Sequence, residues 1–370
     1  MTEKLRVLMV SKACLVGIYQ RKLELIARHG IDLLVLVPPC WKDERGEIPL
    51  ERAYTDGYRL EVLPLRFNGS FHWHYYLGLG RRMRAFRPDV VHIDEEPYNL
   101  ATWQALYHAR RVGAKSLFFS WQNIKRRYPP PFRWGERWVL NTVDYALVGT
   151  DSAGQVWREK GYSGPMATIP QFGTDPELFA PAETRPERPF TIGYIGRLVE
   201  EKGLQVLLEA LTQMDGDWQL RILGAGPYKG ALQAQIARSG LGERAQFGDW
   251  LPSEQVPPYY HRLDAFVLPS LTRANWKEQF GRVLVEAMAS GVPVIGSDSG
   301  AIPGVIGDAG LITPEGDAAK LKVALTQLRD DSALYARLRK AGRDRFLANF
   351  THEQIAGDTV WVYREMTGGS

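Results

Sequence analysis

The chain has 370 residues and a mass of 41.8 kDa, a length that allows two domains with full hydrophobic cores and excludes a small disulfide-stapled scaffold. Hydrophobic residues make up 45% and charged residues 24%, which excludes an intrinsically disordered or fibrous protein. The net charge is +4, and the first 180 residues carry 25 basic against 19 acidic side chains. This surplus is too small for a nucleic-acid interface but favours an anionic surface or substrate.

The opening apolar run covers only Val7–Val10, which is too short for a signal peptide, and no later stretch reaches the roughly 18 apolar residues of a membrane-spanning helix. The two cysteines, Cys14 and Cys40, support neither a disulfide framework nor a zinc site. We therefore expect a cytoplasmic protein.

Short runs rich in Val, Ile, Leu and Phe alternate with amphipathic stretches, as in βα units built around buried parallel sheets. In the first half, strands are predicted at Leu5–Ser11, Asp32–Pro38, Tyr58–Leu65, Asp89–Asp94, Lys115–Ser120, Tyr145–Thr150 and Ala167–Phe172. After a proline-rich linker, further strands are predicted at Phe190–Gly196, Trp218–Gly224, Ala245–Leu251, Ala265–Ser270, Pro293–Asp298 and Gly310–Thr313.

This pattern predicts two doubly wound α/β domains, with the active site in a cleft faced by the carboxyl ends of both sheets. We place the first domain at residues 1–178 and the second at residues 179–351. A final helix at about 352–370, with an aromatic stripe of Trp361 and Tyr363, is expected to pack back on the first domain.

The glycine pattern argues against two common kinds of nucleotide-binding site. The loop after the first strand has one glycine, Gly17, where a dinucleotide fold needs G-x-G-x-x-G. The segment Gly224–Gly230 lacks the spacing of a P-loop. A nicotinamide dehydrogenase and a P-loop enzyme are therefore both disfavoured.

Three carboxylates, Asp94, Glu95 and Glu96, follow the fourth strand at the mouth of the first sheet. In an inverting enzyme one of them would be the general base; otherwise they would bind acceptor hydroxyls. Two aromatic stretches, Phe67–Gly80 and Lys125–Trp138, suit stacking on sugar rings or a lipid headgroup surface, or else pack on their own domain.

Arg197 follows the first strand of the second half immediately, and Lys202 comes five residues later. An Arg fork and a Lys point charge can neutralise a departing diphosphate without a metal ion. On spacing alone, a solvated turn with incidental charges explains the pair equally well.

Glu278 and Glu286 flank Gly281 and the start of a predicted helix. The glycine allows close approach of a ligand, and the helix start offers N–H groups to a phosphate. Either glutamate alone reads as a solvated helix charge. Together with the basic pair they indicate a site for a nucleotide sugar, with both carboxylates accepting hydrogen bonds from its hydroxyls.

The segments Ile192–Gly203, Leu223–Pro227 and Glu278–Gly300 resemble family 4 glycosyltransferases, specifically over residues 190–315 and more weakly over residues 1–170. The resemblance implies the GT-B fold, two Rossmann-like domains facing a central cleft, and transfer with retained anomeric configuration. The second domain would then hold the nucleotide-sugar donor and the first the acceptor.

The resemblance also implies site residues. Arg197 and Lys202 would contact the donor diphosphate, Glu278 the donor sugar and Glu286 the ribose, while Gly17 matches a glycine loop that closes over the phosphates. Together with these, donor contacts are expected at Gly196, Gly224, Gly226, Trp250, Leu251, Phe280, Gly281, Arg282 and Val283.

After the first strand, Val16–Lys22 replace the paired glycines and nearby Glu that are usual in the family, and the sequence departs from the family pattern at two further places. Gln122 and Asn123 stand where many relatives have a His near the donor sugar, and they join Glu95 and Glu96 as candidate acceptor-binding residues. Gly304 stands where relatives commonly have Glu after the Pro.

We therefore expect a metal-independent, retaining hexosyltransferase of polysaccharide biosynthesis, with no cofactor. It would use a nucleotide sugar, by default a UDP-sugar, and a glycan or lipid-linked acceptor, an activity compatible with peripheral association at the inner membrane surface. The alternatives are an epimerase or phosphorylase of the same architecture, or a catalytically silent nucleotide-binding subunit.

Overall fold

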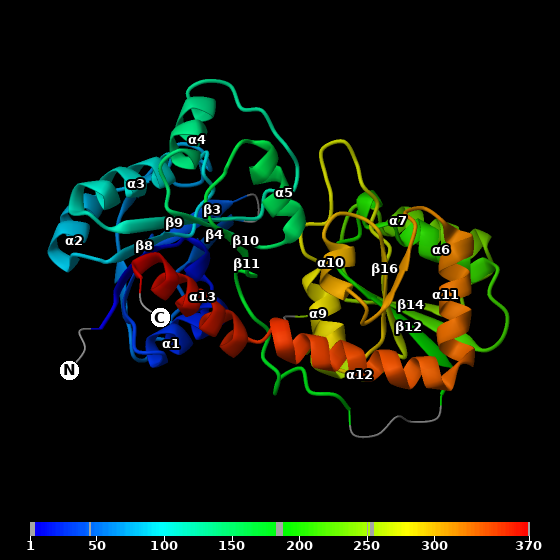
Figure 1. The fold of residues 1–370 in the computed structure, drawn as a ribbon. Coiled ribbons are helices and arrows are strands. Elements are labelled where there is room, and N and C mark those ends of the chain that lie inside the picture. The colour runs from blue at the N-terminus through cyan, green and yellow to red at the C-terminus, as the bar shows by residue number, and fades with distance from the viewer. Residues whose placement is uncertain (1–3, 44–45, 183–187, 250, 252–254, 369–370) are drawn as a thin grey trace. The chain divides into compact units, whose positions relative to one another are not determined.

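The computed structural model describes residues 4–43, 46–182, 188–249, 251 and 255–368. The chain divides into two compact units, drawn in Figure 1. The first contains Met1–Gly173 and His352–Ser370, and the second contains Thr174–Thr351. The first unit therefore ends at residue 173, whereas the sequence predicted a boundary at residue 178.

The first unit is built on a parallel seven-stranded sheet in the order β11-β10-β9-β8-β1-β2-β5. Its inner strands are apolar on both faces because helices cover both sides of a parallel sheet. All seven strands predicted for the first half are present. They are β1 (Arg6–Val10), β2 (Asp32–Val37), β5 (Arg59–Val62), β8 (Val90–Ile93), β9 (Lys115–Ser120), β10 (Tyr145–Val148) and β11 (Met166–Thr168).

Two small antiparallel hairpins that the sequence did not predict are added to the first unit. They pair β3 (Cys40–Asp43) with β4 (Gly46–Pro49) and β6 (Leu65–Arg66) with β7 (Tyr75–Tyr76). The helices of this unit are η1 (Ala13–Leu15), η2 (Gly17–Gln20), α1 (Arg21–Arg28), α2 (Leu79–Phe86), α3 (Leu100–Val112), α4 (Phe132–Leu140), α5 (Asp151–Glu159) and α13 (His352–Thr367).

The C-terminal helix α13 belongs to the first unit and lies beside α1 (Figure 1). Tyr363 is fully buried, and its hydroxyl lies 2.7 Å from Nδ1 of the buried His92 on β8. Trp361 is 58% exposed, so the expected aromatic stripe is wrong. Residues two apart on a helix point to different faces, and only Tyr363 faces the sheet.

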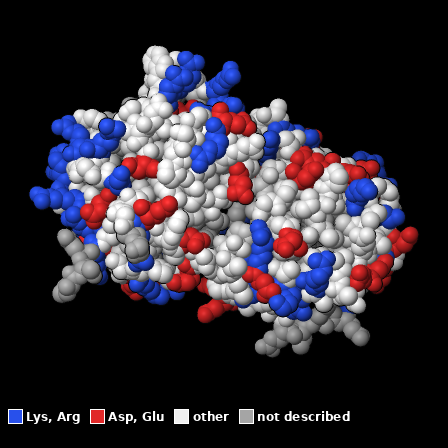
Figure 2. Space-filling model, viewed as in Figure 1, with Lys and Arg blue, Asp and Glu red and all other residues white. Residues whose placement is uncertain are grey.

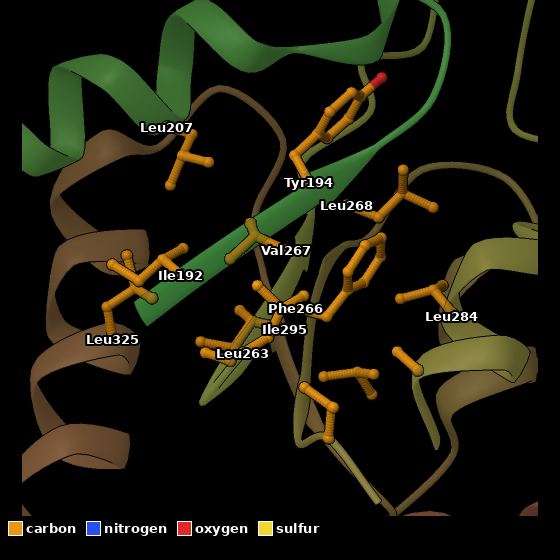
Figure 3. Packing of buried hydrophobic residues seen from close by; sticks show 14 of the residues in the cluster. Ile192, Tyr194, Leu207, Leu263, Phe266, Val267, Leu268, Leu284, Ile295 and Leu325 are labelled. Carbon is orange, nitrogen blue, oxygen red and sulfur yellow. The ribbon is translucent and has the colours of Figure 1, made fainter. Parts of the chain in front are cut away.

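The second unit has a parallel six-stranded sheet in the order β14-β13-β12-β15-β16-β17, which again contains every predicted strand. In Figure 3, Leu207 and Leu325 lie on one side of the strands and Leu284 on the other, which makes a three-layer core. The strands are β12 (Phe190–Ile195), β13 (Trp218–Leu223), β14 (Ala245–Gly248), β15 (Ala265–Leu268), β16 (Val294–Ser297) and β17 (Leu311–Thr313).

The helices of the second unit follow these strands and cover both faces of the sheet. They are η3 (Glu200–Lys202), α6 (Leu204–Thr212), α7 (Lys229–Arg238), α8 (Pro257–Tyr260), α9 (Arg282–Ala289), α10 (Ile302–Ile306), α11 (Ala318–Asp330) and α12 (Ser332–Asn349). Among the described residues, no helix of either unit is both long enough and apolar enough to cross a membrane.

Candidate functional site

A pocket of about 310 Å³ opens at the carboxyl ends of β12 and β13 in the second unit. Strand β12 lies between β13 and β15, so the strand order reverses here, and ligands of open α/β sheets bind at such a reversal. The start of α9 forms another wall. The pocket is lined by Ile195, Gly196, Arg197, Leu223, Gly224, Ala225, Leu251, Val256, Arg282, Val283 and Glu286, most of which are predicted donor contacts.

Two glycines shape this pocket. Gly224 has φ +156°, and a Cβ at this position would lie 1.9 Å from the carbonyl oxygen of Gly196. Gly281 has φ +78° and is the N-cap of α9, so the backbone turns into the helix without a side chain at the N-cap position. At Gly224 and Gly281 the backbone that borders the pocket is therefore not covered by a side chain of its own.

Glu286 lies one turn inside α9 with its carboxylate held from both sides. Nε of Arg282 is 3.1 Å from Oε1, and the Tyr260 hydroxyl donates to Oε2 over 3.0 Å. Burial raises the pKa of Glu286, against the lowering effect of Arg282 and Tyr260. The remaining lone pairs of a carboxylate fixed in this way can accept hydrogen bonds from hydroxyl groups of a ligand.

Lys202 and Glu278 form a largely buried ion pair, with Nζ 2.5 Å from Oε2 and side chains 15% and 9% exposed. The hydroxyl of Ser270 donates to the same Oε2 over 2.9 Å. The Lys202 ammonium also lies 5.1 Å from the centre of the Trp276 ring. The structure thus brings together a cation and a carboxylate that are 76 residues apart in sequence.

Arg197 is exposed at the pocket, and its backbone carbonyl accepts a hydrogen bond of 2.8 Å from the Tyr194 hydroxyl. In the described part of the chain its guanidinium has no ion-pair partner. Phe280 packs edge-on against Phe350, with ring centres 5.9 Å apart. The predicted contact Trp250 lies outside the described residues.

In the first unit, the loop that contains Gly17 is tied to a distant carboxylate. The amide of Gly17 donates to Oε2 of Glu51 over 2.5 Å, and a Cβ on Gly17 would lie 2.8 Å from that of Ala53. The loop therefore packs closely against the segment that follows β4, and its amide is already engaged.

Glu95 is fully buried between two basic side chains. The Lys12 ammonium pairs with Oε2, and Nε2 of His74 lies 3.5 Å from Oε1. Although burial raises the pKa of Glu95, Lys12 and His74 lower it to about 2. Since its side chain has no exposed surface, Glu95 is placed to hold Lys12, not to contact an acceptor directly as the sequence predicted.

The His74 ring is fixed by the backbone: its Nδ1 lies 3.1 Å from the carbonyl of Ser70 and 3.0 Å from that of Phe71, and because carbonyl oxygens only accept hydrogen bonds, Nδ1 acts as a donor. Among the residues that the structure describes, no group of three or more His, Cys, Asp or Glu side chains could hold a metal ion.

The other two carboxylates after β8 are also bound internally. Asp94 accepts from the Ser11 hydroxyl over 2.5 Å and from Nε2 of Gln171 over 2.8 Å, and burial raises its pKa. Glu96 accepts from the Ser120 hydroxyl over 2.6 Å and from the amide of Trp121 over 2.9 Å. Burial raises the pKa of Glu96 to about 7, against these hydrogen bonds.

Gln122 and Asn123 are both buried just after β9. Gln122 donates from Nε2 to the carbonyl of Ile124 over 2.9 Å, and its Oε1 accepts from Lys160 Nζ over 3.3 Å. The predicted acceptor residues of the first unit therefore gather at the carboxyl edge of β8 and β9.

Sequence analysis missed Lys12, His74 and Tyr260, each of which fixes a predicted carboxylate. Lys12 stands two residues after β1, much as Arg197 stands two residues after β12, so the rule that found Arg197 could have found it. No sequence signal pairs His74 or Tyr260 with a glutamate, since these contacts come from tertiary packing.

Two family models cover most of the chain. Residues 176–345 match the model described as glycosyl transferases group 1, and residues 19–171 match the glycosyl transferase 4-like domain. The two matches follow the second and the first unit closely, so each sheet is matched separately.

Curated relatives are glycosyltransferases. The amylovoran biosynthesis glycosyltransferase AmsK of Erwinia amylovora is 33% identical over 190 residues, 48% of this chain and 47% of the relative. The GDP-mannose-dependent alpha-(1-6)-phosphatidylinositol monomannoside mannosyltransferase of Mycolicibacterium smegmatis is 31% identical over 261 residues, 65% of this chain and 68% of the relative. The chain thus spans about half to two thirds of the length of these relatives.

A solved structure shows the same fold. The crystal structure of HepE from Anabaena in complex with UDP superposes with a TM-score of 0.71 over 98% of this chain and 100% of that one, at 16% identity. AmsK and the mannosyltransferase are both glycosyltransferases, so these comparisons do not favour an epimerase or a phosphorylase. With both units matched by glycosyltransferase models and the mannosyltransferase matched over more than two thirds of its length, the chain belongs to the glycosyltransferases of the GT-B fold.

Proposed function

We propose that this protein transfers a hexose from a nucleotide-sugar donor to a hydroxyl group of a glycan or lipid-linked acceptor, with retention of anomeric configuration, as in family 4. The observation that carries the proposal is the pocket at the ends of β12 and β13, which gathers Arg197, Arg282 and Glu286 at the N-terminus of α9.

This pocket suits a nucleoside diphosphate. Arg197 and the N-terminus of α9 supply positive charge for the phosphates, and Lys202 lies near the same edge. Glu286 offers acceptor lone pairs for the ribose hydroxyls, and Glu278 for those of the sugar. The nonpolar side chains Leu251, Val256 and Val283 provide surface for the base.

The same groups support retention without a metal ion. Arg197 and Lys202 stabilise the charge that develops on the leaving diphosphate, the task a divalent cation performs elsewhere. A donor phosphate oxygen can take the acceptor proton on the face from which the diphosphate leaves, so no separate base is required. The internal hydrogen bonds of Asp94 and Glu96 support roles other than that of a general base.

The donor base is proposed as uracil. HepE, of the same fold, was crystallised with UDP, which supports this choice, whereas the mannosyltransferase is GDP-mannose-dependent by its name. AmsK belongs by its name to amylovoran biosynthesis, which supports a polysaccharide intermediate as acceptor. We place the reaction in the cytoplasm, with peripheral association at the membrane.

Thermal shift of the full chain with UDP, GDP, ADP and dTDP, each with and without EDTA, tests the donor site, because a ligand of the native state raises Tm by mass action. We expect a shift with UDP that survives EDTA. The anomeric configuration of the product, read by NMR, tests retention. The proposal would be contradicted if EDTA abolished consumption of the donor, or if the product had the opposite anomeric configuration to the donor.

A further inference from the structure

The first unit has a second cavity, of about 670 Å³, that none of the roles above uses. It is enclosed by the segment before α4, by α4 itself and by the end of α5. Figure 2 shows Lys and Arg side chains gathered where Figure 1 places α4. We call this cavity the basic pocket; its cationic lining residues are Lys125, Arg126, Arg127, Arg133, Arg137 and Lys160.

Two carboxylates, Glu136 and Glu159, also line the basic pocket, and lysines neutralise both. Lys160 Nζ lies 2.5 Å from Oε1 of Glu136, a pair whose side chains are only 7% and 9% exposed. Lys125 Nζ lies 3.4 Å from Oε2 of Glu159. Neither carboxylate is thus paired with Arg127, Arg133 or Arg137.

Arg127, Arg133 and Arg137 are exposed, and their guanidinium groups have no hydrogen-bond or ion-pair partner within the described ranges. Like charges around one cavity repel each other, and an anion bound among them removes this repulsion. Guanidinium groups bind phosphate oxygens in a bidentate manner, so three arginines on one wall favour a phosphate over a single carboxylate.

We propose that the basic pocket binds the phosphate or diphosphate group of an anionic ligand, at a site separate from the nucleotide-sugar pocket of the second unit. Lys160 connects it to the acceptor residues, because its Nζ donates to Oε1 of Gln122 over 3.3 Å. The identity of the ligand rests on the proposed function: in a glycosyltransferase the ligand of this pocket is the acceptor, and the acceptor carries a phosphate group.

The pocket-lining arginines of α4 are exposed at the surface, and so is Trp134 of the same helix. The phosphate group can therefore belong to a soluble sugar phosphate or to a lipid headgroup. Both have the same anionic chemistry, and the experiment distinguishes them.

The test uses the full chain with the donor cations removed, Arg197→Gln with Lys202→Gln, and titrates it with inorganic pyrophosphate by calorimetry. We expect one site per chain. Adding Arg127→Gln, Arg133→Gln and Arg137→Gln should weaken this binding by at least about tenfold, since several charge-assisted hydrogen bonds are lost.

A charge-matched control removes Arg81, Arg84 and Arg110 instead, which are exposed on α2 and α3 of the same unit. This variant should bind pyrophosphate as before. Equal weakening in the pocket and control variants would overturn the proposal, since only the overall charge would then attract pyrophosphate. It would also be overturned if the Arg197→Gln, Lys202→Gln protein, with its pocket arginines intact, did not bind pyrophosphate.

Protection from phenylglyoxal, read by mass spectrometry on the unsubstituted protein, gives the same answer without mutation. Pyrophosphate should protect Arg127, Arg133 and Arg137 and leave Arg81, Arg84 and Arg110 reactive; uniform reactivity would count against the site. Cosedimentation with vesicles of phosphatidylcholine, with and without phosphatidic acid, then identifies the source. Binding to phosphatidic acid that is lost in the pocket variant assigns a lipid phosphate, and pyrophosphate binding alone assigns a soluble one.

The proposed function and the basic pocket fail independently. A UDP-induced thermal shift that persists after Arg127→Gln, Arg133→Gln and Arg137→Gln reports the second unit, whereas pyrophosphate protection of these three arginines in the unsubstituted protein reports the first. A UDP shift without pyrophosphate protection leaves the transferase standing and removes the phosphate site.

Discussion

Substitutions in the ion pair of Lys202 and Glu278 can distinguish a role in donor binding from a purely structural role. Both side chains are mostly buried, and Nζ lies 2.5 Å from Oε2, so each partner neutralises the other in the absence of a ligand. We predict that Lys202→Met and Glu278→Gln have similar effects on stability but opposite effects on the binding of UDP.

For stability, Lys202→Met leaves a partly buried carboxylate without its cation, and Glu278→Gln leaves a partly buried ammonium without its counter-charge. A hydrogen bond to a charged group contributes about 1.5–3 kcal/mol, so each variant should lose about 2 kcal/mol of the free energy of unfolding. For a unit of this size, 1 kcal/mol corresponds to about 2–4 °C in Tm, which gives a decrease of about 4–8 °C. The double variant should lose little more than either single one.

For binding, Lys202→Met removes a cation from the phosphate site, and UDP affinity should fall by about tenfold or more. Glu278→Gln leaves Lys202 as an unneutralised cation, so UDP affinity should stay the same or rise. The same variant should lose affinity for the UDP-sugar relative to UDP, because one acceptor of sugar hydroxyls is gone.

Calorimetric titration with UDP and with a UDP-sugar measures both ligands, and differential scanning fluorimetry measures Tm. Lys340→Met, which removes an exposed lysine from α12 with a side chain 79% exposed, is the matched control and should change neither quantity. If Glu278→Gln weakens UDP as much as Lys202→Met does, the pair is only a scaffold and its assignment to the donor is refuted.

Three further predictions concern single residues. Glu286→Gln should weaken UDP binding by about tenfold through loss of a charged acceptor, with kcat at saturating donor less affected; unchanged affinity by calorimetry would remove the ribose assignment. Gly224→Ala should lower the free energy of unfolding of the second unit by at least about 2 kcal/mol, since its Cβ would lie 1.9 Å from a carbonyl oxygen. Gly230→Ala, with open space around it, is the control and should be neutral or stabilising. Urea unfolding measures both. Burial raises the pKa of Glu96 to about 7, above its unfolded value near 4.5. The stability that the protonated Glu96 contributes is therefore complete below pH 4.5 and is lost as the pH rises through 7. The Tm of the unsubstituted protein should fall between pH 5 and pH 8 more than that of Glu96→Gln, and parallel pH profiles would contradict this reasoning.

The strands of both sheets could be predicted because parallel strands buried on both faces are continuous apolar runs. Val7–Val10 and Phe266–Leu268 are such runs, and both are fully or almost fully buried. The hairpins β3–β4 and β6–β7 were missed because their strands have two to four residues and include exposed side chains, so neither an apolar run nor an alternation marks them.

The site in the second unit could be predicted for a different reason. Its residues follow strand ends or begin a helix, and parallel strands bring their carboxyl ends to one edge. Arg197, Gly224 and Glu286 are therefore neighbours by topology alone. The ion pairs of the first unit depend on loops, as with Gly17 and Glu51 or His74 and Glu95, and no local pattern specifies how a loop folds back.

A comparison of the two units explains where their positive charge can act. Each has a lysine after its first strand, and each lysine pairs with a buried glutamate: Lys12 with Glu95, and Lys202 with Glu278. In the second unit Arg197 adds a cation at the strand end without an ion pair among the described residues, so that edge keeps a charge for a diphosphate. In the first unit Lys12 is neutralised by a glutamate whose pKa is about 2 and which therefore stays ionised. Any anion that the first unit binds must then be attracted by other cations, and Arg127, Arg133 and Arg137 of the basic pocket are not paired with its lining carboxylates.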